Sequence, residues 1–404
     1  MTQIISLCSV DHRPLHRSSA TRRHPFRPAK RVAIIKTFHL NLHSEIVFYI
    51  REHAQKMDTK KKSPHISKRI TTEEIAARLG ISAMTVSRAL NDRPNVDKKT
   101  RERILETARK LGYTPNHIAR SLVLRRTETI GVVVPEITHS FFPEVIRGIE
   151  DVTYSAGYHL ILTHSAEDDE RERDVIRTLQ SKRVDGLLIS TAQTVKDYSS
   201  YVDAIRLGIP IVFFDRVVQD IGASCVSIDD ENCSERITEH LIGHGYKSIA
   251  HLSGPTTVSI GKARLRGFHK ALTRNGLKFK PELVVESGFH EKGGYQAMQS
   301  LLQLPVRERP DAVVAVNDPA AFGAMKAIQE HRLRIPQDIA IVGMSDDIRA
   351  ELVFSPLTTI RQSAYEIGKT AAETLISEIE GKSKPGRKII VQTELVIRKS
   401  CGCL

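Results

Sequence analysis

Few side chains of this sequence have the types and spacing that metal binding requires. His240 and His244 stand four residues apart on an expected helix, which can place two imidazoles beside one ion. Cys401 and Cys403 flank a single glycine and could bind a metal or react as thiols. No acidic or third ligand is evident beside the histidines, so we interpret them as surface residues and the Cys-Gly-Cys segment as an inert, frayed terminus. We therefore predict no metal site.

The residue patterns of common enzymes are also missing. The sequence has no glycine-rich nucleotide loop, no serine of the nucleophile-elbow kind and no zinc-protease helix. The acidic run EDDERERD at residues 167–174 could hold a metal, but it begins an expected helix, where the helix dipole favours carboxylates. We interpret this run as a solvated helix start, and we predict neither catalysis nor a bound cofactor.

The basic residues are concentrated at the front of the chain. Residues 1–126 hold 27 of the 60 Lys and Arg residues but only 10 of the 47 Asp and Glu residues, in a chain of 404 residues with a formal net charge of +13. A basic front part on a mildly acidic body is typical of a nucleic-acid-binding domain joined to a regulatory one. No run approaches the roughly 18 apolar residues of a membrane span. The five scattered cysteines indicate a reducing cytoplasm rather than a disulfide framework.

A cluster of short helices is expected over residues 68–113. Thr71 and Glu74 form a capping box at the start of the first helix, Ser82 caps the second and Asp97 caps the third. A helix-turn-helix DNA-binding domain has the same order of elements: a helix, a tight turn with glycine, a second helix and a supporting third helix. A bundle of this size could also serve protein contacts, but DNA is favoured by the adjacent basic residues Arg78, Arg88, Lys98, Lys99, Arg101 and Arg103.

Residues 1–57 are basic and lack the apolar pattern of a core. We interpret them as a disordered extension. We favour a translation start placed too early, because Met57 opens a segment, MDTKKKS, that looks like a natural N-terminus. A transit peptide is the alternative, whereas the apolar stretch of a secretory signal is missing.

From Thr129 onward, short apolar strands alternate with amphipathic helices, which is typical of parallel sheets buried on both faces. About ten strands are too many for one ordinary sheet, so we predict two doubly wound α/β lobes. Lobe one is expected at about residues 129–229 plus 362–386, and lobe two at about 230–361 plus 387–404, with 388–398 as a single final strand. In such folds, ligands bind at the carboxyl ends of the strands.

The stretch TTEEIAARLGISAMTVSRALNDRPNVDKKTRERILETARKLGYTPNHIARSLVLRRTETIGVVVP resembles the lactose-repressor (LacI-type) family of transcription regulators. The resemblance continues through VDGLLIS, IPIVFFDR, HLIGHGYKSIAHLSGP, ARLRGF, AVNDPAAFGAMKAI, RIPQDIAIVGMSDD and PLTTIRQ, and covers about residues 68–400. It implies an all-α helix-turn-helix head, a hinge helix at residues 114–127 and a two-lobed, periplasmic-binding-protein-like effector domain at 128–404. It also implies a cytoplasmic homodimer that represses carbohydrate genes from a palindromic DNA operator.

In this family the second helix reads the operator, and here that helix starts at Ser82. The resemblance places Ala83, Met84 and Arg88 at base edges, where Arg can grip guanine and a short apolar group can meet a thymine methyl. Ala83 and Met84 lack hydrogen-bonding side chains, so we expect Arg88 to supply more of the base recognition. The positions that touch or flank phosphates are Thr71, Thr85, Ser87 and Asn91, although each hydroxyl could instead cap a helix.

The resemblance places Asn116, Ala119 and Leu122 of the hinge segment at DNA-facing positions. A helix this short is marginal in water, so we expect it to form only on DNA or against its dimer mate. The resemblance implies that Leu122 wedges into the minor groove and kinks the duplex. The alternative is a plain linker, with Leu122 packed on the body.

The resemblance also implies an effector site in the cleft between the lobes. The expected residues are Phe141, Phe142, Asp215, Arg216, Arg264, Phe289, Asn317, Asp318, Asp346 and Gln362. Carboxylate and guanidinium groups suit hydroxyls and Phe suits a ring face, so we expect a sugar or sugar phosphate; core packing is the alternative for the phenylalanines. The loop at residues 254–260 lacks the Arg of the family's nucleobase-binding branch, so a purine is not expected.

Two other classes of protein share this body fold. A periplasmic sugar-binding receptor would need a signal peptide and no basic head. A sugar-acting enzyme would need catalytic or cofactor-binding motifs. The sequence shows neither set of features, and we predict a regulator.

Overall fold

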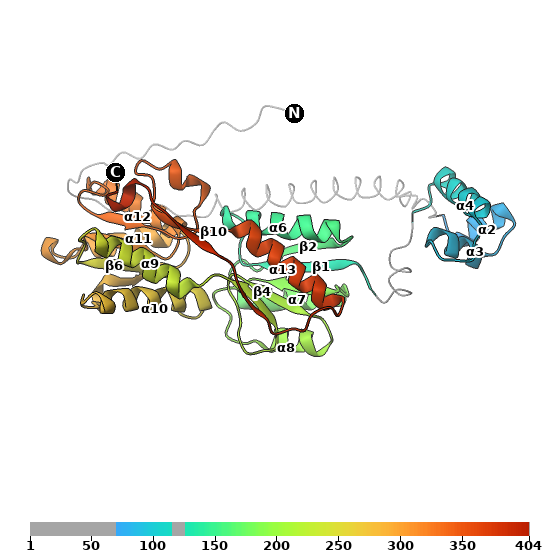
Figure 1. Ribbon diagram of the computed structural model, residues 1–404, viewed down its shortest axis with the longest axis horizontal. Helices are drawn as coiled ribbons and strands as arrows, with labels where there is room; N and C mark the ends of the chain where they lie inside the picture. The colour runs from blue at the N-terminus through green and yellow to red at the C-terminus, as the bar shows by residue number, and fades with distance from the viewer. Residues whose placement is uncertain (1–69, 115–125, 404) are drawn as a thin grey trace, which may run out of the picture. The chain divides into compact units, whose positions relative to one another are not determined.

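The structure, a computed structural model, describes residues 70–114 and 126–403. The chain divides into two compact units, Met1–Thr114 and Pro115–Leu404 (Figure 1). The extension at residues 1–57 and the hinge residues Asn116, Ala119 and Leu122 lie outside the described residues, so the expectations for them stay predictions. None of the helices in the described ranges is long and apolar enough to cross a membrane.

The described part of the first unit is a bundle of the helices α2 (Thr72–Leu79), α3 (Ala83–Leu90) and α4 (Lys98–Leu111). The predicted capping box is present: Thr71 Oγ1 accepts from the N–H of Glu74 (3.4 Å), whose carboxylate accepts from the N–H of Thr71 (3.3 Å). Gly80 ends α2 with a φ of 64°, a left-handed conformation that glycine adopts at little cost. The bundle closes on a core of Ile75, Ala76, Val86, Ala89, Ile104 and Ala108. The predicted helix-turn-helix head is confirmed.

The first sheet of the second unit is parallel throughout, with strand order β11-β5-β4-β3-β1-β2. Its strands are β1 (Thr129–Val134), β2 (His159–His164), β3 (Gly186–Ile189), β4 (Ile211–Phe214), β5 (Ser224–Ser227) and β11 (Lys388–Ile390). Helices α6 (Phe141–Ser155) and α13 (Ala364–Ile379) cover one face, and α7 (Asp169–Ser181) and α8 (Ser199–Arg206) cover the other. Apolar side chains therefore fill both faces of this sheet, as the continuous apolar strands predict.

Helices α6 and α13 approach each other closely enough to require glycine at their contact. A Cβ at Gly148 would lie 2.2 Å from the carbonyl oxygen of Tyr365, and one at Gly368 would lie 2.0 Å from that of Val145. Because real Cβ atoms do not come so near to backbone, the two glycines allow this contact. It joins segments that are far apart in the sequence into lobe one.

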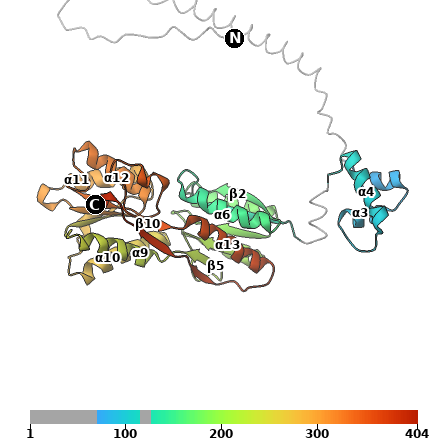
Figure 2. The ribbon, with the colours of Figure 1, turned by 45° about the horizontal axis from the view of Figure 1, so that its top comes forward.

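The second sheet is also parallel, with strand order β7-β6-β8-β9. Its strands are β6 (Ile249–Ser253), β7 (Val284–Glu286), β8 (Ala312–Ala315) and β9 (Ala340–Val342). Figure 2 shows α9 (Asp230–Gly243) and α10 (Ser259–Arg274) on one side of it and α11 (Glu291–Leu302) and α12 (Asp318–Glu330) on the other. The predicted pair of doubly wound α/β lobes is confirmed.

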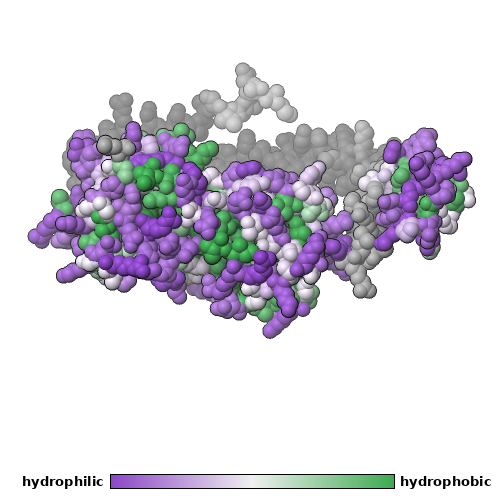
Figure 3. Space-filling model, viewed as in Figure 1, coloured by the Kyte–Doolittle hydropathy of each residue, from purple (hydrophilic) through white to green (hydrophobic). Residues whose placement is uncertain are grey.

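The final segment differs from the single strand expected at residues 388–398. Its first part is β11, which pairs with β5 and extends lobe one beyond the expected boundary at residue 386. Its second part, β12 (Thr393–Val396), pairs antiparallel with β10 (Thr359–Gln362). The strand divides because the chain leaves the first sheet at this point to return to lobe two. Figure 3 shows polar residues over most of the visible surface of each unit, broken by small apolar patches.

Candidate functional site

Helix α3 presents one face to solvent and buries the opposite one. Val86 and Ala89 are buried in the head core, whereas Met84, Ser87 and Arg88 are exposed, Met84 over 65% of its surface. These exposed positions follow the three- and four-residue spacing of one helix face. Within the described ranges, the Arg88 guanidinium has no hydrogen bond or ion pair, so its donors are available to a partner molecule.

Several hydroxyls of the predicted DNA-contact set are used by the helices themselves. Ser82 Oγ accepts from the N–H of Thr85 (3.1 Å) and lies 2.8 Å from Thr85 Oγ1. Asn91 ends α3, and its Nδ2 donates to the carbonyl oxygen of Ser87 (2.8 Å). Ala83 is half-buried and packs against the head core. Of the three expected base readers, Met84 and Arg88 therefore face solvent most fully.

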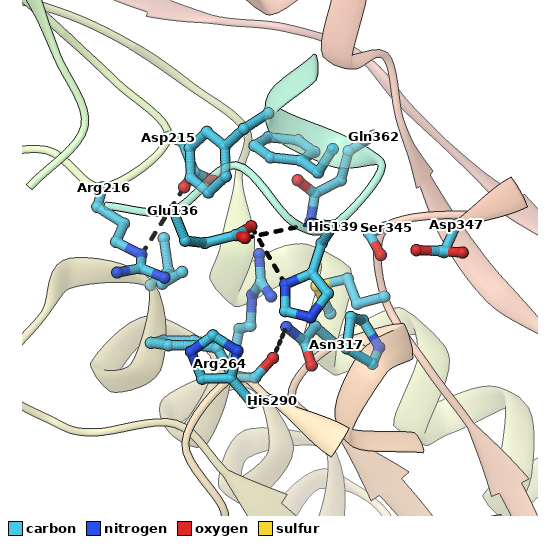
Figure 4. Close-up of a pocket in the computed structure, with 16 residues that line it drawn as sticks. Glu136, His139, Asp215, Arg216, Arg264, His290, Asn317, Ser345, Asp347 and Gln362 are labelled. Carbon is cyan, nitrogen blue, oxygen red and sulfur yellow. Dashed lines mark hydrogen bonds and ion pairs between the residues drawn. The ribbon is translucent and has the colours of Figure 1, made fainter. Parts of the chain in front are cut away.

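A pocket lies at the carboxyl ends of strands from both sheets, between the two lobes of the second unit (Figure 4). It encloses about 510 Å³, open solvent at its mouth included. Eight of the ten residues predicted there line it: Phe141, Phe142, Asp215, Arg216, Arg264, Phe289, Asn317 and Gln362. The other lining residues, which the sequence did not single out, are Glu136, His139, Ile260, His290, Pro319, Met344, Ser345 and Asp347.

Arg264, on α10, is buried at the pocket and paired with an acid. Its Nε donates to Asp230 Oδ1 (2.8 Å), one terminal nitrogen lies 2.7 Å from the same oxygen, and the other donates to the carbonyl oxygen of Val316 (2.6 Å). Burial raises the pKa of Asp230, and the Arg264 charge opposes that rise. The pair fixes the guanidinium in place, because Asp230 is the first residue of α9 and Val316 follows β8.

Arg216, which follows β4, brings a second buried guanidinium to the pocket. One terminal nitrogen donates to both carboxylate oxygens of Glu167 (2.8 Å each), and the guanidinium carbon lies 4.4 Å from the ring centroid of Phe289. Its Nε is buried without a hydrogen-bond partner among the described residues. Buried polar groups are normally satisfied, so this N–H is free to donate to a ligand or water oxygen.

Asp215 is the carboxylate between these two cations. Its φ is 57°, in the left-handed region that Asp and Asn tolerate better than other side chains. Ser190 Oγ donates to it over 3.4 Å, and its Oδ2 lies 4.0 Å from Arg216 Nε. Burial raises the pKa of Asp215 to about 6, against the opposing charges of Arg216 and Arg264. At neutral pH it is a buried carboxylate with spare capacity to accept hydrogen bonds.

Polar contacts cross between the lobes beside the pocket. His139, in the loop after β1, lies 3.1 Å from Glu136 and 3.2 Å from Glu291, which is the first residue of α11 in lobe two. Ser140 Oγ donates to Asp347 Oδ2 (2.8 Å), also in lobe two. Hydrogen bonding to Glu136 raises the pKa of His139. The sequence carries no signal for these contacts, because the partners come from distant segments.

Asp318 and Asp346 do not line the pocket, although the sequence predicted them there. Asp318 is buried and accepts from Thr359 Oγ1 (2.6 Å) and from the N–H of Asp347 (2.8 Å). Burial raises the pKa of Asp318 to about 7. Asp346 pairs with Arg361 (2.7 Å) and Arg398 (2.8 Å). Both aspartates hold lobe two together, because their side chains point to neighbouring strands.

The apolar and amide residues of the pocket serve the fold as well. Phe142 and Phe289 are only 4% exposed and belong to the core clusters, so lining the pocket and packing the core are compatible. Asn317 caps α12 by accepting from the N–H of Ala320 (3.0 Å), and its Nδ2 donates to the carbonyl oxygen of Phe289 (2.9 Å). These contacts hold the pocket wall in one arrangement before any ligand binds.

The acidic run at residues 167–174 begins helix α7 with several exposed residues, as the sequence suggested, but two of its acids are not solvated. Glu167 pairs with Arg216, and Asp168 caps α7 by accepting from the N–H of Arg171 (2.8 Å). Glu172 is 1% exposed, accepts from the N–H of Ala192 (2.7 Å) and hydrogen-bonds the Tyr201 hydroxyl. Burial raises the pKa of Glu172. Glu167 and Glu172 therefore stabilise the part of lobe one next to the pocket.

The head, the two-lobed body and the pocket between the lobes define a helix-turn-helix regulator with a periplasmic-binding-protein-like domain. Two family models match the sequence: bacterial regulatory proteins of the lacI family over residues 71–116, and the periplasmic binding proteins and sugar binding domain of the LacI family over residues 127–399. The chain is 34% identical over 331 residues to the HTH-type transcriptional repressor PurR of Pasteurella multocida (strain Pm70), which covers 82% of this chain and 98% of the relative. The protein belongs to the LacI family of transcriptional regulators.

Other members of the family match most of the chain in sequence or in structure. The ribose operon repressor of Haemophilus influenzae is 33% identical over 330 residues, which is 82% of this chain and 98% of the relative. A solved structure of the lac repressor dimer bound to operator and the anti-inducer ONPF matches with a TM-score of 0.73 and 28% identity, covering 83% of this chain and 99% of that one. A complex of the transcriptional regulator CelR with cellobiose matches with a TM-score of 0.63 and 28% identity, covering 82% and 100%.

Proposed function

We propose that this regulator is a homodimeric repressor of carbohydrate-use genes, controlled by a sugar or sugar phosphate bound between the lobes. The observation that carries the proposal is the pocket itself, which joins the carboxylate of Asp215, the buried guanidinium groups of Arg216 and Arg264, and aromatic rings at the carboxyl ends of both sheets. Hydroxyl-rich ligands need acceptors and donors at fixed positions, and an aromatic ring can cover the apolar face of a sugar.

Each polar group has a role toward such a ligand. Asp215 would accept hydrogen bonds from ligand hydroxyls, while Arg264 and the Nε of Arg216, which has no hydrogen-bond partner among the described residues, would donate to ligand oxygens. Hydrogen bonds to charged groups contribute about 1.5–3 kcal/mol each, so these three side chains could dominate the affinity. Two related regulators, CelR and a LacI-family regulator of Enterococcus faecium, have been solved with cellobiose and with ribose, in keeping with this class.

The DNA-binding role of individual residues is part of the same proposal. Arg88 and Met84 face outward from α3 and would meet base edges in the major groove, with Ser87 and Asn91 beside them near phosphates. Asn116, Ala119 and Leu122 would form the hinge contacts in the minor groove. A dimer would present two copies of α3 and so read a palindromic operator.

Regulation would act through the relative placement of the lobes. The pocket is built from both lobes, so a bound ligand favours the placement that brings its partners together. The hinge joins lobe one to the head, and a change in lobe placement would alter how the two hinges of a dimer meet. Coupling of this kind between ligand binding and operator binding typically amounts to about 1–3 kcal/mol, which corresponds to a change of roughly 5–150-fold in operator affinity.

A thermal-shift screen with sugars, sugar phosphates and purine bases tests the effector class. A ligand at about 100 times its Kd adds about 2.7 kcal/mol to the free energy of unfolding, which is readily seen as a rise in Tm. We expect a sugar or sugar phosphate to stabilise the wild type, and the same concentration to stabilise Asp215→Asn by only about 1.4 kcal/mol, because this variant should bind about tenfold more weakly. Stabilisation by a purine base alone would overturn the proposed effector class.

A further inference from the structure

Four metal-ligating side chains meet on lobe two, away from the pocket. They are His240 and His244 at the end of α9, and Cys401 and Cys403 near the end of the chain. Their ligand atoms all lie within 4.8 Å of one another. Cys403 Sγ is 3.0 Å from His244 Nε2 and 3.7 Å from His240 Nε2, although Cys403 and His244 are 159 residues apart in the sequence. The histidines lie at or near the surface, as expected, but the interpretation of the Cys-Gly-Cys segment as a frayed terminus is wrong, because Cys401 is buried.

The helix presents the two imidazoles together. The four-residue spacing places His240 and His244 on one face, and their ring centroids are 4.7 Å apart. His244 is the C-cap residue of α9 and is exposed, whereas His240 is half-buried. This arrangement leaves the Nε2 atoms of both rings facing the terminal thiols.

The terminal segment is anchored so that both thiols face the helix. Ser400 Oγ donates to the carbonyl oxygen of Ile341 (2.6 Å) and accepts from the N–H of Thr358 (2.8 Å). Cys401 is fully buried, and Thr358 Oγ1 donates to its Sγ (3.1 Å). Gly402 has a φ of 96°, which strongly favours glycine, and this turn brings Cys403 back beside Cys401. The cluster is thus held by contacts outside it.

The donor set and its spacing fit zinc. Bond lengths of about 2.3 Å to sulfur and about 2.0 Å to nitrogen place tetrahedral ligand atoms roughly 3.3–3.8 Å apart. Of the two sulfur–nitrogen distances given above, 3.7 Å falls within this range and 3.0 Å lies just below it, and the remaining ligand atoms are close enough to reach it by small side-chain rotations. Two thiols and two imidazoles select zinc-like ions, whereas magnesium and calcium prefer oxygen ligands.

The surroundings of Cys401 also suit a metal-bound thiolate. Thr358 Oγ1 donates a hydrogen bond to the Cys401 sulfur (3.1 Å), and a thiolate would accept this bond more strongly than a thiol. Thr358 would then be an outer partner that orients the sulfur, a common feature around metal ligands.

We propose that His240, His244, Cys401 and Cys403 bind one Zn²⁺-like transition-metal ion in a closed, four-ligand structural site that fastens the terminal segment to α9. Four protein ligands leave no open position for a substrate, so the role is structural. The site stands at the opposite end of α9 from Asp230, which holds Arg264 at the pocket. This inference goes beyond the proposed function and does not depend on it.

Cobalt titration of the reduced, metal-free full chain tests the site. We expect one Co²⁺ per chain with the visible bands of tetrahedral cobalt and the ultraviolet band of a thiolate ligand, all removed when Zn²⁺ is added. His244→Asn and Cys403→Ser should each weaken Co²⁺ binding at least about 100-fold, because loss of even an outer-shell partner costs about 10–100-fold. These two side chains lie at the surface of the cluster, so their replacement leaves the core intact.

Matched controls separate this site from adventitious binding. Cys225→Ser removes a buried free thiol from another part of the protein, His159→Asn removes an exposed histidine, and Cys8→Ser removes a thiol near the start of the chain. All three should keep the wild-type cobalt spectrum. Zinc should also raise the Tm of the wild type and of the controls but not of the ligand variants.

Three results would overturn the proposal. One is no stoichiometric Co²⁺ or Zn²⁺ binding by the reduced wild type. Another is a cobalt spectrum that survives in both His244→Asn and Cys403→Ser, which would show binding elsewhere. The third is a Cys401–Cys403 disulfide found by mass spectrometry in protein kept under reducing conditions.

Discussion

The imidazole Nε2 of His139 in lobe one lies 3.2 Å from the carboxylate of Glu291 in lobe two. The same ring contacts Glu136 of its own lobe at 3.1 Å, so one histidine stands between two acids from opposite sides of the cleft. His139 also lines the pocket. A contact that joins the lobes at the pocket would influence the ligand-dependent change in lobe placement that we propose.

We predict that this contact makes stability fall at alkaline pH. Hydrogen bonding to Glu136, helped by the charge of Glu291, raises the pKa of His139 above its ordinary value. The protonated ring binds both acids, so its contribution to the free energy of unfolding is complete at low pH and is lost as pH rises through the raised pKa. Tm measured from about pH 6 to about pH 9 should therefore fall less steeply in His139→Gln than in the wild type. If Tm changes with pH to the same extent in both proteins, this contact does not contribute to the pH dependence of stability.

Asp215→Asn should make the ligand-free protein more stable and the ligand complex weaker. Burial raises the pKa of Asp215 to about 6, so the folded state binds a proton more tightly than the unfolded state does. The stability linked to that proton is present below about pH 4 and lost as pH rises through about 6. At pH 7 the neutral amide should therefore add about 1–3 kcal/mol to the free energy of unfolding, while effector binding weakens about tenfold.

Denaturant titrations at about pH 7 and about pH 4, with calorimetry of effector binding, check both parts. The stabilisation should be present only at the higher pH. An Asn variant that is less stable than the wild type at neutral pH would show that the carboxylate supports the fold rather than the ligand.

Arg88→Ala should reduce sequence discrimination. A bidentate contact from Arg to guanine is worth about 1–3 kcal/mol, so operator binding should weaken by that amount and preference at one base pair per half-site should flatten. Arg103→Ala is the matched control, because it removes the same charge from an exposed position on α4. The test is to select binding sites with both variants and compare the base preference at each position. We expect the preference to change for Arg88→Ala alone, and an unchanged preference would show that Arg88 does not read a base.

Leu122→Ala and Arg264→Ala should separate the two activities. Loss of the proposed wedge should weaken operator binding and reduce the DNA bend while leaving effector binding normal. Loss of Arg264 should weaken effector binding about tenfold or more while leaving operator affinity near that of the wild type. Because Arg264→Ala would leave Asp230 buried without its partner, the double variant with Asp230→Ala controls for instability. Gel-shift titration beside calorimetry measures both activities, and equal damage to both in a folded Arg264 variant would contradict the pocket assignment.

The sequence predicted the elements well because their causes are local. Caps such as Thr71 and Ser82, and the apolar runs of the strands, act within a few residues. It predicted less well where a side chain points. Asp346 follows a strand of lobe two, as a pocket residue should, but its carboxylate turns to Arg361 and Arg398.

The features that the sequence missed depend on distant segments. His139 meets Glu291, and Cys403 meets His244, only after the lobes have formed. The histidine pair and the Cys-Gly-Cys segment each contain only two of the four ligands, so neither motif alone indicated a metal site. Only the return of the chain end to α9 brings the four together.

The central claim is that a ligand in the interlobe pocket controls operator binding. Its most direct measurement is the operator Kd, by fluorescence anisotropy at physiological salt, with and without a saturating amount of the ligand that the thermal-shift screen identifies. We predict that this ligand changes the operator Kd of the wild type by roughly 5–150-fold, and that Asp215→Asn requires about tenfold more ligand for the same change. An operator Kd that stays constant while the ligand saturates the pocket would contradict it.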